Sequence, residues 1–133
     1  MKIEDVEGIG PAWAAKLSDA GVRTTDDLLM AGGSAGGRER LEAATGISSK
    51  RLLEWVNHVD LMRINGVGSE YADLLEAAGV DSAAELAQRN AKNLAETFQE
   101  LDAARNTVRH IPAEAVIAGW IDEAKTLDKV VSH

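Results

Sequence analysis

The amino-acid sequence predicts an all-α protein made of two similar halves. Two observations support this prediction. Residues 3–22 read IEDVEGIGPAWAAKLSDAGV and return at residues 61–80 as LMRINGVGSEYADLLEAAGV. In addition, apolar residues recur at helical spacing along the chain, and no segment alternates between apolar and polar residues as a half-buried strand does. The expected architecture is about ten short helices in two tandem units.

The two copies keep a constant offset, because Gly8 and Gly66 lie 58 positions apart, as do the other matching residues. The first unit is therefore expected to cover residues 1–58 and the second residues 59–133. A chain of 133 residues with 45% apolar content can bury a substantial core, so we expect the units to pack as one compact body.

The centre of each copy is a glycine–apolar–glycine turn, formed by Gly8, Ile9 and Gly10 in the first and by Gly66, Val67 and Gly68 in the second. Glycine can take a positive φ or let two backbones approach closely. A helix should begin at Pro11, whose missing N–H costs nothing at a first helical position. It should end at Gly21, in the left-handed conformation.

This pattern resembles the helix-hairpin-helix family, whose signature is apolar-x-Gly-apolar-Gly followed by alanine and an aliphatic residue, here Ala14 and Leu17. In that family, N–H groups at the second glycine and at the start of the second helix bind a nucleic-acid phosphate. The physical basis is general, because free N–H groups and the positive end of the helix dipole favour an anion. The resemblance implies a SAM-like, paired helix-hairpin-helix fold, in which the hairpins either bind a ligand or serve only as packing units.

The segments after the first copy are also expected to be helical. A connector helix is predicted over residues 24–31, and AGGSAGG at residues 31–37 is expected to be a flexible turn that breaks it. Residues 38–56 read helix, Gly-Ile-Ser, helix, which indicates a second, degenerate hairpin. In the second half we expect a long helix over about residues 94–108 and a last helix that opens at Pro112.

Composition limits the functions that the chain can have. The net charge of −8 argues against a strongly basic nucleic-acid surface. The absence of cysteine suits a cytoplasmic protein. The start, MKIEDVEG, is too charged for a secretory signal, and no apolar run reaches the roughly 20 residues that span a bilayer. We expect a soluble cytoplasmic protein without a membrane partner.

The charge is unevenly distributed between the halves. Residues 1–58 carry 7 Lys/Arg against 9 Asp/Glu, whereas residues 59–133 carry 7 against 13. The first half is therefore the better candidate for an anionic partner, and its candidate contacts are Gly8, Ile9, Gly10, Ala12, Trp13, Lys16, Arg38, Arg40, Lys50 and Arg51. At the second copy, Glu70 would repel a phosphate, so we expect that turn to be structural and Gly68→Ala to cost mainly stability.

No catalytic, metal or cofactor site is expected. His58, His110 and His133 lack the spacing of a zinc site, and no nucleophile elbow or small-molecule site is evident. Trp55 and Trp120 fit apolar helix faces, whereas Trp13 and Tyr71 hold equivalent positions just after the turns. Either of the latter two could be partly exposed and stack on a base.

The whole chain also resembles a bacterial family of small proteins that is classed as a domain of unknown function and is built from these hairpins. The residues that carry this resemblance are EGIGPAWAAKL, ATGISSKRLLEWVNHVDLMRINGVG and EYADLLEAAGVDSAAELAQRN. Our first hypothesis is a non-catalytic module that contacts the DNA or RNA backbone weakly, through the first hairpin and without sequence readout. The alternative is an acidic adaptor that binds another protein, in which the hairpins only support the fold.

Overall fold

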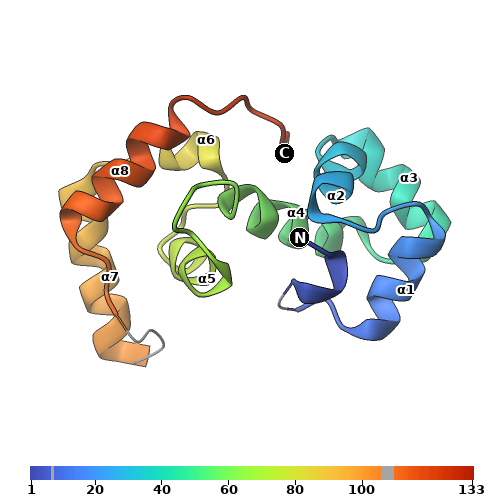
Figure 1. Ribbon diagram of the computed structural model, residues 1–133, viewed down its shortest axis with the longest axis horizontal. Helices are drawn as coiled ribbons and strands as arrows, with labels where there is room; N and C mark the ends of the chain where they lie inside the picture. The colour runs from blue at the N-terminus through green and yellow to red at the C-terminus, as the bar shows by residue number, and fades with distance from the viewer. Residues whose placement is uncertain (7, 106–109) are drawn as a thin grey trace. The chain divides into compact units, whose positions relative to one another are not determined.

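The structure is a computed structural model, and it describes residues 1–6, 8–105 and 110–133. These residues form one 3-10 turn and eight α-helices, without a strand (Figure 1). In chain order the elements are η1 (Ile3–Asp5), α1 (Pro11–Asp19), α2 (Thr25–Gly32), α3 (Ala35–Thr45), α4 (Ser49–Leu61), α5 (Ser69–Ala77), α6 (Ala83–Leu86), α7 (Ala91–Arg105) and α8 (Glu114–Ala124). Within these described ranges, no helix is long and apolar enough to cross a membrane.

The all-α prediction is confirmed, but the expected number of about ten helices is wrong for the described part of the chain. The segment before the first turn is a single 3-10 turn, Ile3–Asp5. The segment before the second turn begins at Leu61, the last residue of α4, and the rest of it is not helical. The repeat therefore adds one α-helix per copy, α1 and α5, rather than two.

The helices group into two compact units. Unit 1 comprises Met1–Asp60 together with Val130–His133, and unit 2 comprises Leu61–Lys129. The expected boundary after residue 58 thus falls inside α4, which continues to Leu61. The last four residues belong to unit 1, because Val131 is 2% exposed and lies in that unit's core. The packing of the units as one body stays a prediction.

In unit 1, the short elements surround a single apolar core. An isolated antiparallel bridge joins Lys2 to Thr24 and ties the start of the chain to the beginning of α2. The completely buried side chains of this core come from α1, α2, α4 and the turn before α4, and they are Leu17, Leu28, Ile47, Leu52 and Val56. Since these residues follow the helical spacing in the sequence, amphipathic periodicity accounts for the core.

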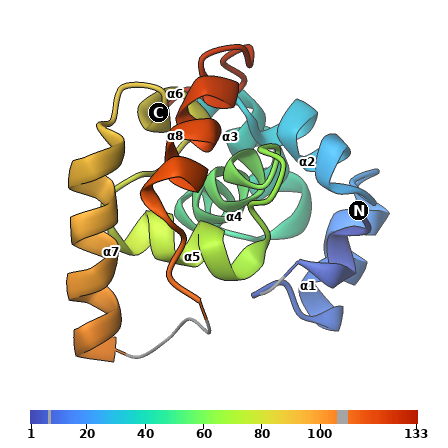
Figure 2. The ribbon, with the colours of Figure 1, turned by 60° about the vertical axis from the view of Figure 1, so that its left-hand side comes forward.

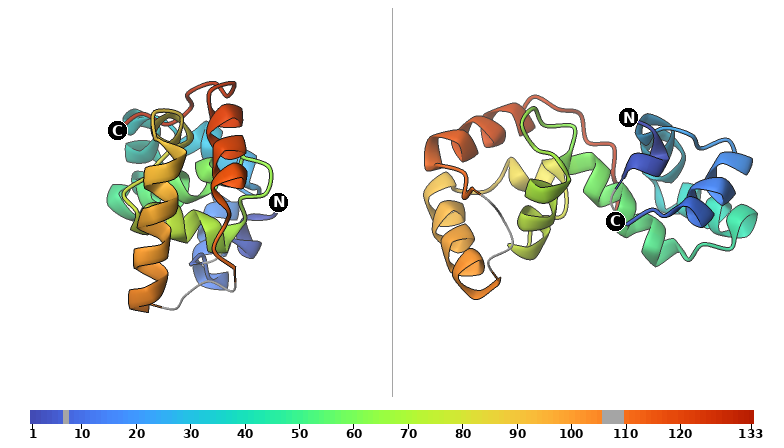
Figure 3. Two further views of the ribbon diagram at one scale, coloured as in Figure 1. Left: turned by 90° about the vertical axis from the view of Figure 1, so that its left-hand side faces the viewer. Right: turned by 60° about the horizontal axis from the view of Figure 1, so that its bottom comes forward.

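Unit 2 has a core of its own. Helices α7 and α8 lie side by side in both Figure 2 and the left view of Figure 3, and α8 also contacts α6. The largest completely buried side chain is Phe98 of α7, and Ile117 of α8 is buried with it. α8 begins at Glu114, with Ala113 as its N-cap, and not at Pro112 as predicted. Of the long helix expected over residues 94–108, residues 94–105 lie in α7, and the rest fall outside the described residues.

The repeated stretch has the same backbone geometry in both copies. Gly8 and Gly66 have φ values of 90° and 89°. Gly21 and Gly79, both at φ 88°, end α1 and α5 in the predicted left-handed conformation. In the first copy, the Val22 N–H reaches back to the Leu17 carbonyl at 2.8 Å and the Gly21 N–H to the Ser18 carbonyl at 3.0 Å, which is a Schellman cap.

The aromatic pairs repeat as well. Trp55 and Trp120 are 6% and 4% exposed, which confirms that they belong to the cores. Trp13 lies 6.1 Å from Trp55, and Tyr71 lies 5.3 Å from Trp120, between ring centroids. Trp13 and Tyr71 are half-buried.

The strain at the second turn lies at a different glycine than expected. A Cβ at Gly66 would face a φ of +89° and the Trp120 indole nitrogen at 3.3 Å. Gly68 is the N-cap of α5 with an ordinary φ of −92°, and among the described atoms none lies within 4 Å of its ideal Cβ position. The expected stability cost therefore belongs to Gly66→Ala rather than to Gly68→Ala.

The AGGSAGG stretch is a helix junction and not a flexible turn. α2 ends at Gly32, and Ser34 caps α3 by accepting a hydrogen bond from the Gly37 N–H at 3.0 Å. Gly33 and Gly37 are buried. A Cβ at Gly37 would lie 2.1 Å from the Ala31 carbonyl oxygen, so glycine is needed here for close packing.

Candidate nucleic-acid interface

The first turn of α1 has backbone N–H groups that precede the first hydrogen bond within the helix. Gly10 is the N-cap in an extended conformation, and Pro11 occupies the first helical position. The first bond within the helix runs from the Ala14 N–H to the Gly10 carbonyl at 2.9 Å. The N–H groups of Ala12 and Trp13 therefore have no acceptor within the helix, as is general for a first turn. Buried Ile9, 3% exposed, anchors the turn below them.

Two cations flank the indole ring at this helix start. The Lys16 ammonium lies 5.3 Å from the centroid of Trp13, and the Arg51 guanidinium carbon lies 5.4 Å from it. The edge of the ring packs on Trp55 at an interplanar angle of 64°. Both distances are those of cation–π contacts, which hold the long side chains near the ring. Lys16 comes from α1 and Arg51 from α4, so two helices contribute to one basic cluster, Trp13–Lys16–Arg51.

The segment between α3 and α4, which was predicted to be a degenerate hairpin, contains a turn that precedes a helix. Gly46 has a φ of 76° and ends α3, and the next residue, Ile47, is completely buried. The Ser48 side chain then accepts from the Arg51 N–H at 3.2 Å, so this helix start carries its own cap. Gly46 and Ile47 thus hold the roles that Gly8 and Ile9 have in the first copy.

The other three predicted cations differ in accessibility. Arg40 on α3 and Lys50 on α4 are exposed. Arg38 is only 4% exposed, and its guanidinium donates to three backbone carbonyls, those of Gly32 at 2.9 Å, Gly33 at 3.0 Å and Ser132 at 2.6 Å. A guanidinium in this position cannot reach a phosphate, so Arg38 is a structural residue and leaves the set of accessible cations.

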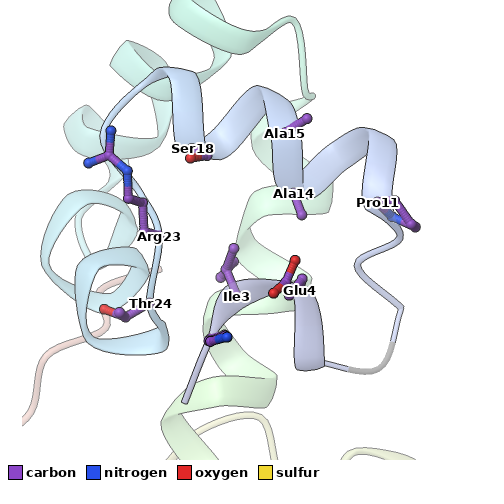
Figure 4. Close-up of a pocket in the computed structure, with 9 residues that line it drawn as sticks. Ile3, Glu4, Pro11, Ala14, Ala15, Ser18, Arg23 and Thr24 are labelled. Carbon is purple, nitrogen blue, oxygen red and sulfur yellow. The ribbon is translucent and has the colours of Figure 1, made fainter.

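A pocket of about 480 Å³ lies between α1 and η1 (Figure 4). Pro11, Ala14, Ala15 and Ser18 of α1 form one wall, and Ile3 and Glu4 of η1 lie across from them. Lys2 and Arg23 add two exposed cations to its rim. These two residues were not among the predicted contacts. The 58-residue offset does distinguish them, because their counterparts are Asp60 and Asp81.

Arg23 also takes part in the cap of α2. Its backbone N–H and that of Thr24 donate to the Asp27 carboxylate at 3.1 Å each, and Thr24 in turn accepts from the Asp27 N–H. The Arg23 N–H is the main cause that lowers the pKa of Asp27 below its ordinary value. This is a capping box, and Ser82 and Asp81 repeat part of it around Glu85 in unit 2.

The second turn places different chemistry at its helix start. α5 begins with Ser69 and carries exposed Glu70 in its first turn. The Tyr71 hydroxyl, at the position equivalent to Trp13, donates to the His110 carbonyl at 3.1 Å. A carboxylate beside the N–H groups satisfies the helix dipole internally.

Comparison with known proteins gives a family but no activity. Neither the curated proteins nor the solved structures contain a match to this sequence. The family model described as the domain of unknown function DUF4332 matches residues 7–127, which include residues 7–22 of the first copy of the repeat and all of the second. The chain therefore belongs to the DUF4332 family.

Proposed function

We propose that the chain is a tandem helix-hairpin-helix protein and that unit 1 is a non-catalytic module that binds the nucleic-acid backbone. The N–H groups of Ala12 and Trp13 would bind a phosphate, and Lys16 and Arg51 would neutralise it or its neighbour. The contact is independent of base sequence. A cytoplasmic location, expected from the composition, belongs to the same proposal.

The observation that carries this proposal is the convergence of the two cations on Trp13. Lys16 and Arg51 are separated by 35 positions in the sequence, yet each lies within 5.4 Å of the same ring. A helix start alone is common in any helical protein. Lys16 lies in the last turn of α1, but its ammonium is near the ring of Trp13, which belongs to the first turn. Two exposed cations from two different helices thus lie near a helix start that already favours anions.

The expected affinity is low. Each DNA phosphate that a protein cation neutralises releases about 0.9 counterion from the duplex, and this release favours binding. With Lys16 and Arg51 as the main cations and Arg40 and Lys50 farther out, two to four contacts are available. The net charge of −8 opposes association at long range. We therefore expect micromolar binding or weaker at about 50 mM salt.

The test compares charge reversals at matched positions. Lys16→Glu and Arg51→Glu remove the two cations, and Gly10→Glu places a carboxylate at the helix start. Lys92→Glu, at an exposed position on α7 in unit 2, makes the same change in net charge away from the cluster. Binding of each variant to a fluorescent duplex and to single-stranded DNA is measured by anisotropy at about 50 mM salt.

The proposal predicts that the three variants in unit 1 lose binding, by at least about tenfold for each reversed cation, whereas Lys92→Glu changes it little. If all four variants bind equally, the interaction depends only on net charge and the cluster has no role. If Gly10→Glu binds as the unchanged protein does, the helix start is not the phosphate site.

A second candidate function is an acidic adaptor for another protein. It is favoured by the exposed carboxylates of unit 2, where Asp73 and Asp81 replace Ala15 and Arg23 of unit 1 at equivalent positions. Binding measurements on the unchanged protein distinguish the two functions. Absence of nucleic-acid binding at low salt, together with a partner captured through unit 2 and lost on Asp73→Lys, would favour the adaptor.

A further inference from the structure

The last four residues of the sequence occupy a built site on unit 1. Val131 is 2% exposed and packs into the core of that unit. The Ser132 N–H donates to the Gly33 carbonyl at 2.8 Å, and the Ser132 carbonyl accepts from Arg38 Nη2 at 2.6 Å. Two hydrogen bonds of the Ser132 backbone and the buried side chain of Val131 thus hold the segment on unit 1. We call its partners Gly33, Arg38 and Asn57 the tail site.

The tail site is prepared by unit 1 itself. Arg38 Nη1 donates to the carbonyls of Gly32 and Gly33, so the guanidinium is held in place by two bonds that do not involve the tail. Gly33 has no Cβ, and one built there would lie 2.2 Å from the Val130 carbonyl oxygen. A site that is ordered before its ligand arrives loses less entropy on binding.

The chemistry of these contacts defines what the site accepts. Main-chain hydrogen bonds hold any extended segment, and a side-chain socket selects its sequence. The socket takes the small aliphatic Val131, and the next residue must carry an N–H, which excludes proline. The His133 imidazole adds a contact to the Asn57 side chain at 2.9 Å.

We propose that the tail site is a peptide-binding surface whose partner in trans is the tail of a second copy of this chain. Unit 2, residues Leu61–Lys129, separates the tail from the rest of unit 1 along the sequence. Every contact that holds the tail is the same whichever copy supplies it, and this is the condition for exchange between copies. The chain's own tail competes at a high effective concentration, so exchange requires its release. The inference is independent of nucleic-acid binding.

The test supplies the tail as a separate peptide to a full-length chain that cannot use its own. The double variant Val131→Asp/Ser132→Pro removes the apolar contact and the N–H donor. The probe is a fluorescein-labelled peptide of residues 126–133, TLDKVVSH, amidated so that no carboxylate is added. Binding is followed by anisotropy, with circular dichroism as the check that the variant is folded.

We expect saturable binding to the double variant. Binding to the unchanged protein, whose site is filled, should be at least about tenfold weaker. Peptides that carry Val131→Asp or Ser132→Pro should bind the double variant at least about tenfold less well than the original peptide. No binding by the folded double variant, or equal binding of all three peptides, would overturn the proposal.

A second measurement applies if the double variant does not fold. Because the sequence has no cysteine, Asn57→Cys and His133→Cys can be placed in two separate chains, which are mixed with a short bismaleimide cross-linker. We expect a covalent heterodimer from this mixture and much less when exposed Lys92→Cys replaces Asn57→Cys. Equal yields in the two mixtures, or no heterodimer in either, would contradict exchange of the tail.

Discussion

Replacing Arg38 by methionine tests whether the buried guanidinium stabilises unit 1. Methionine keeps most of the aliphatic length and removes all the donors. The three acceptors then lose their partner, which had been placed at 2.9, 3.0 and 2.6 Å. Ser132 is exposed, so its carbonyl can bind water, and the buried Gly33 carbonyl still accepts from the Ser132 N–H at 2.8 Å. The buried Gly32 carbonyl is therefore the acceptor that the substitution affects most.

The magnitude follows from the buried Gly32 carbonyl, because the Gly33 carbonyl keeps the Ser132 N–H as a donor. An unsatisfied buried acceptor costs about 1–3 kcal/mol. Relief of the desolvation of the buried charge offsets part of this cost. We therefore expect Arg38→Met to lower the free energy of unfolding of unit 1 by about 1–2 kcal/mol. With a urea dependence of about 1–3 kcal/mol per molar, the midpoint should fall by at least about 0.3 M.

The assay is urea unfolding followed by tryptophan fluorescence. In a Trp120→Phe background the remaining tryptophans, Trp13 and Trp55, both lie in unit 1. The matched control is Arg40→Met, an exposed arginine on the same helix, which should change stability by less than about 0.5 kcal/mol. Equal midpoints for the two variants would refute the structural role of Arg38.

Three further outcomes are expected. Gly66→Ala should cost about 1–3 kcal/mol, because φ is positive there, and clearly more than Gly68→Ala. Both are measured by urea unfolding with Trp120 unchanged, because the two glycines and Trp120 lie in unit 2. Thr24→Ala should cost about 1 kcal/mol through loss of the capping box, again measured by urea unfolding. Because the pKa of Asp27 is lowered in the folded state, its contribution is present above the ordinary carboxyl pKa and is lost as the pH falls through the folded value. The difference in unfolding midpoint between Asp27→Asn and the unchanged protein should therefore be larger at pH 7 than at pH 2.5, and a constant difference would contradict this assignment.

The repeat was enough to predict much of the local geometry. A glycine at the same place in both copies predicted an unusual backbone conformation, and Gly8 and Gly66 do have positive φ. Helical spacing likewise predicted that Trp55 and Trp120 are buried. These features depend on contacts within one unit, so the spacing of residues in a short stretch of sequence is enough to predict them.

The roles that could not be predicted depend on contacts between distant parts of the chain. Arg38 reads as a surface cation beside a hairpin, and its acceptor on Ser132 lies 94 positions away. The glycines of AGGSAGG were interpreted as flexible. The reason for glycine at Gly33 is the close approach of the Val130 carbonyl, and Val130 is also remote in sequence. The convergence of Arg51 on Trp13 was also hidden, since the two residues lie on separate helices.

The most direct test of backbone binding by unit 1 is the salt dependence of its affinity for duplex DNA. Anisotropy titrations of the unchanged protein at several salt concentrations from about 50 to 200 mM give the slope of log K against log salt. Two to four phosphate contacts predict a slope of about −2 to −4 and equal affinity for duplexes of unrelated sequence, with the slope shallower by about one unit in Arg51→Glu. The absence of saturable binding at about 50 mM salt, or binding with no dependence on salt, would contradict the proposed function.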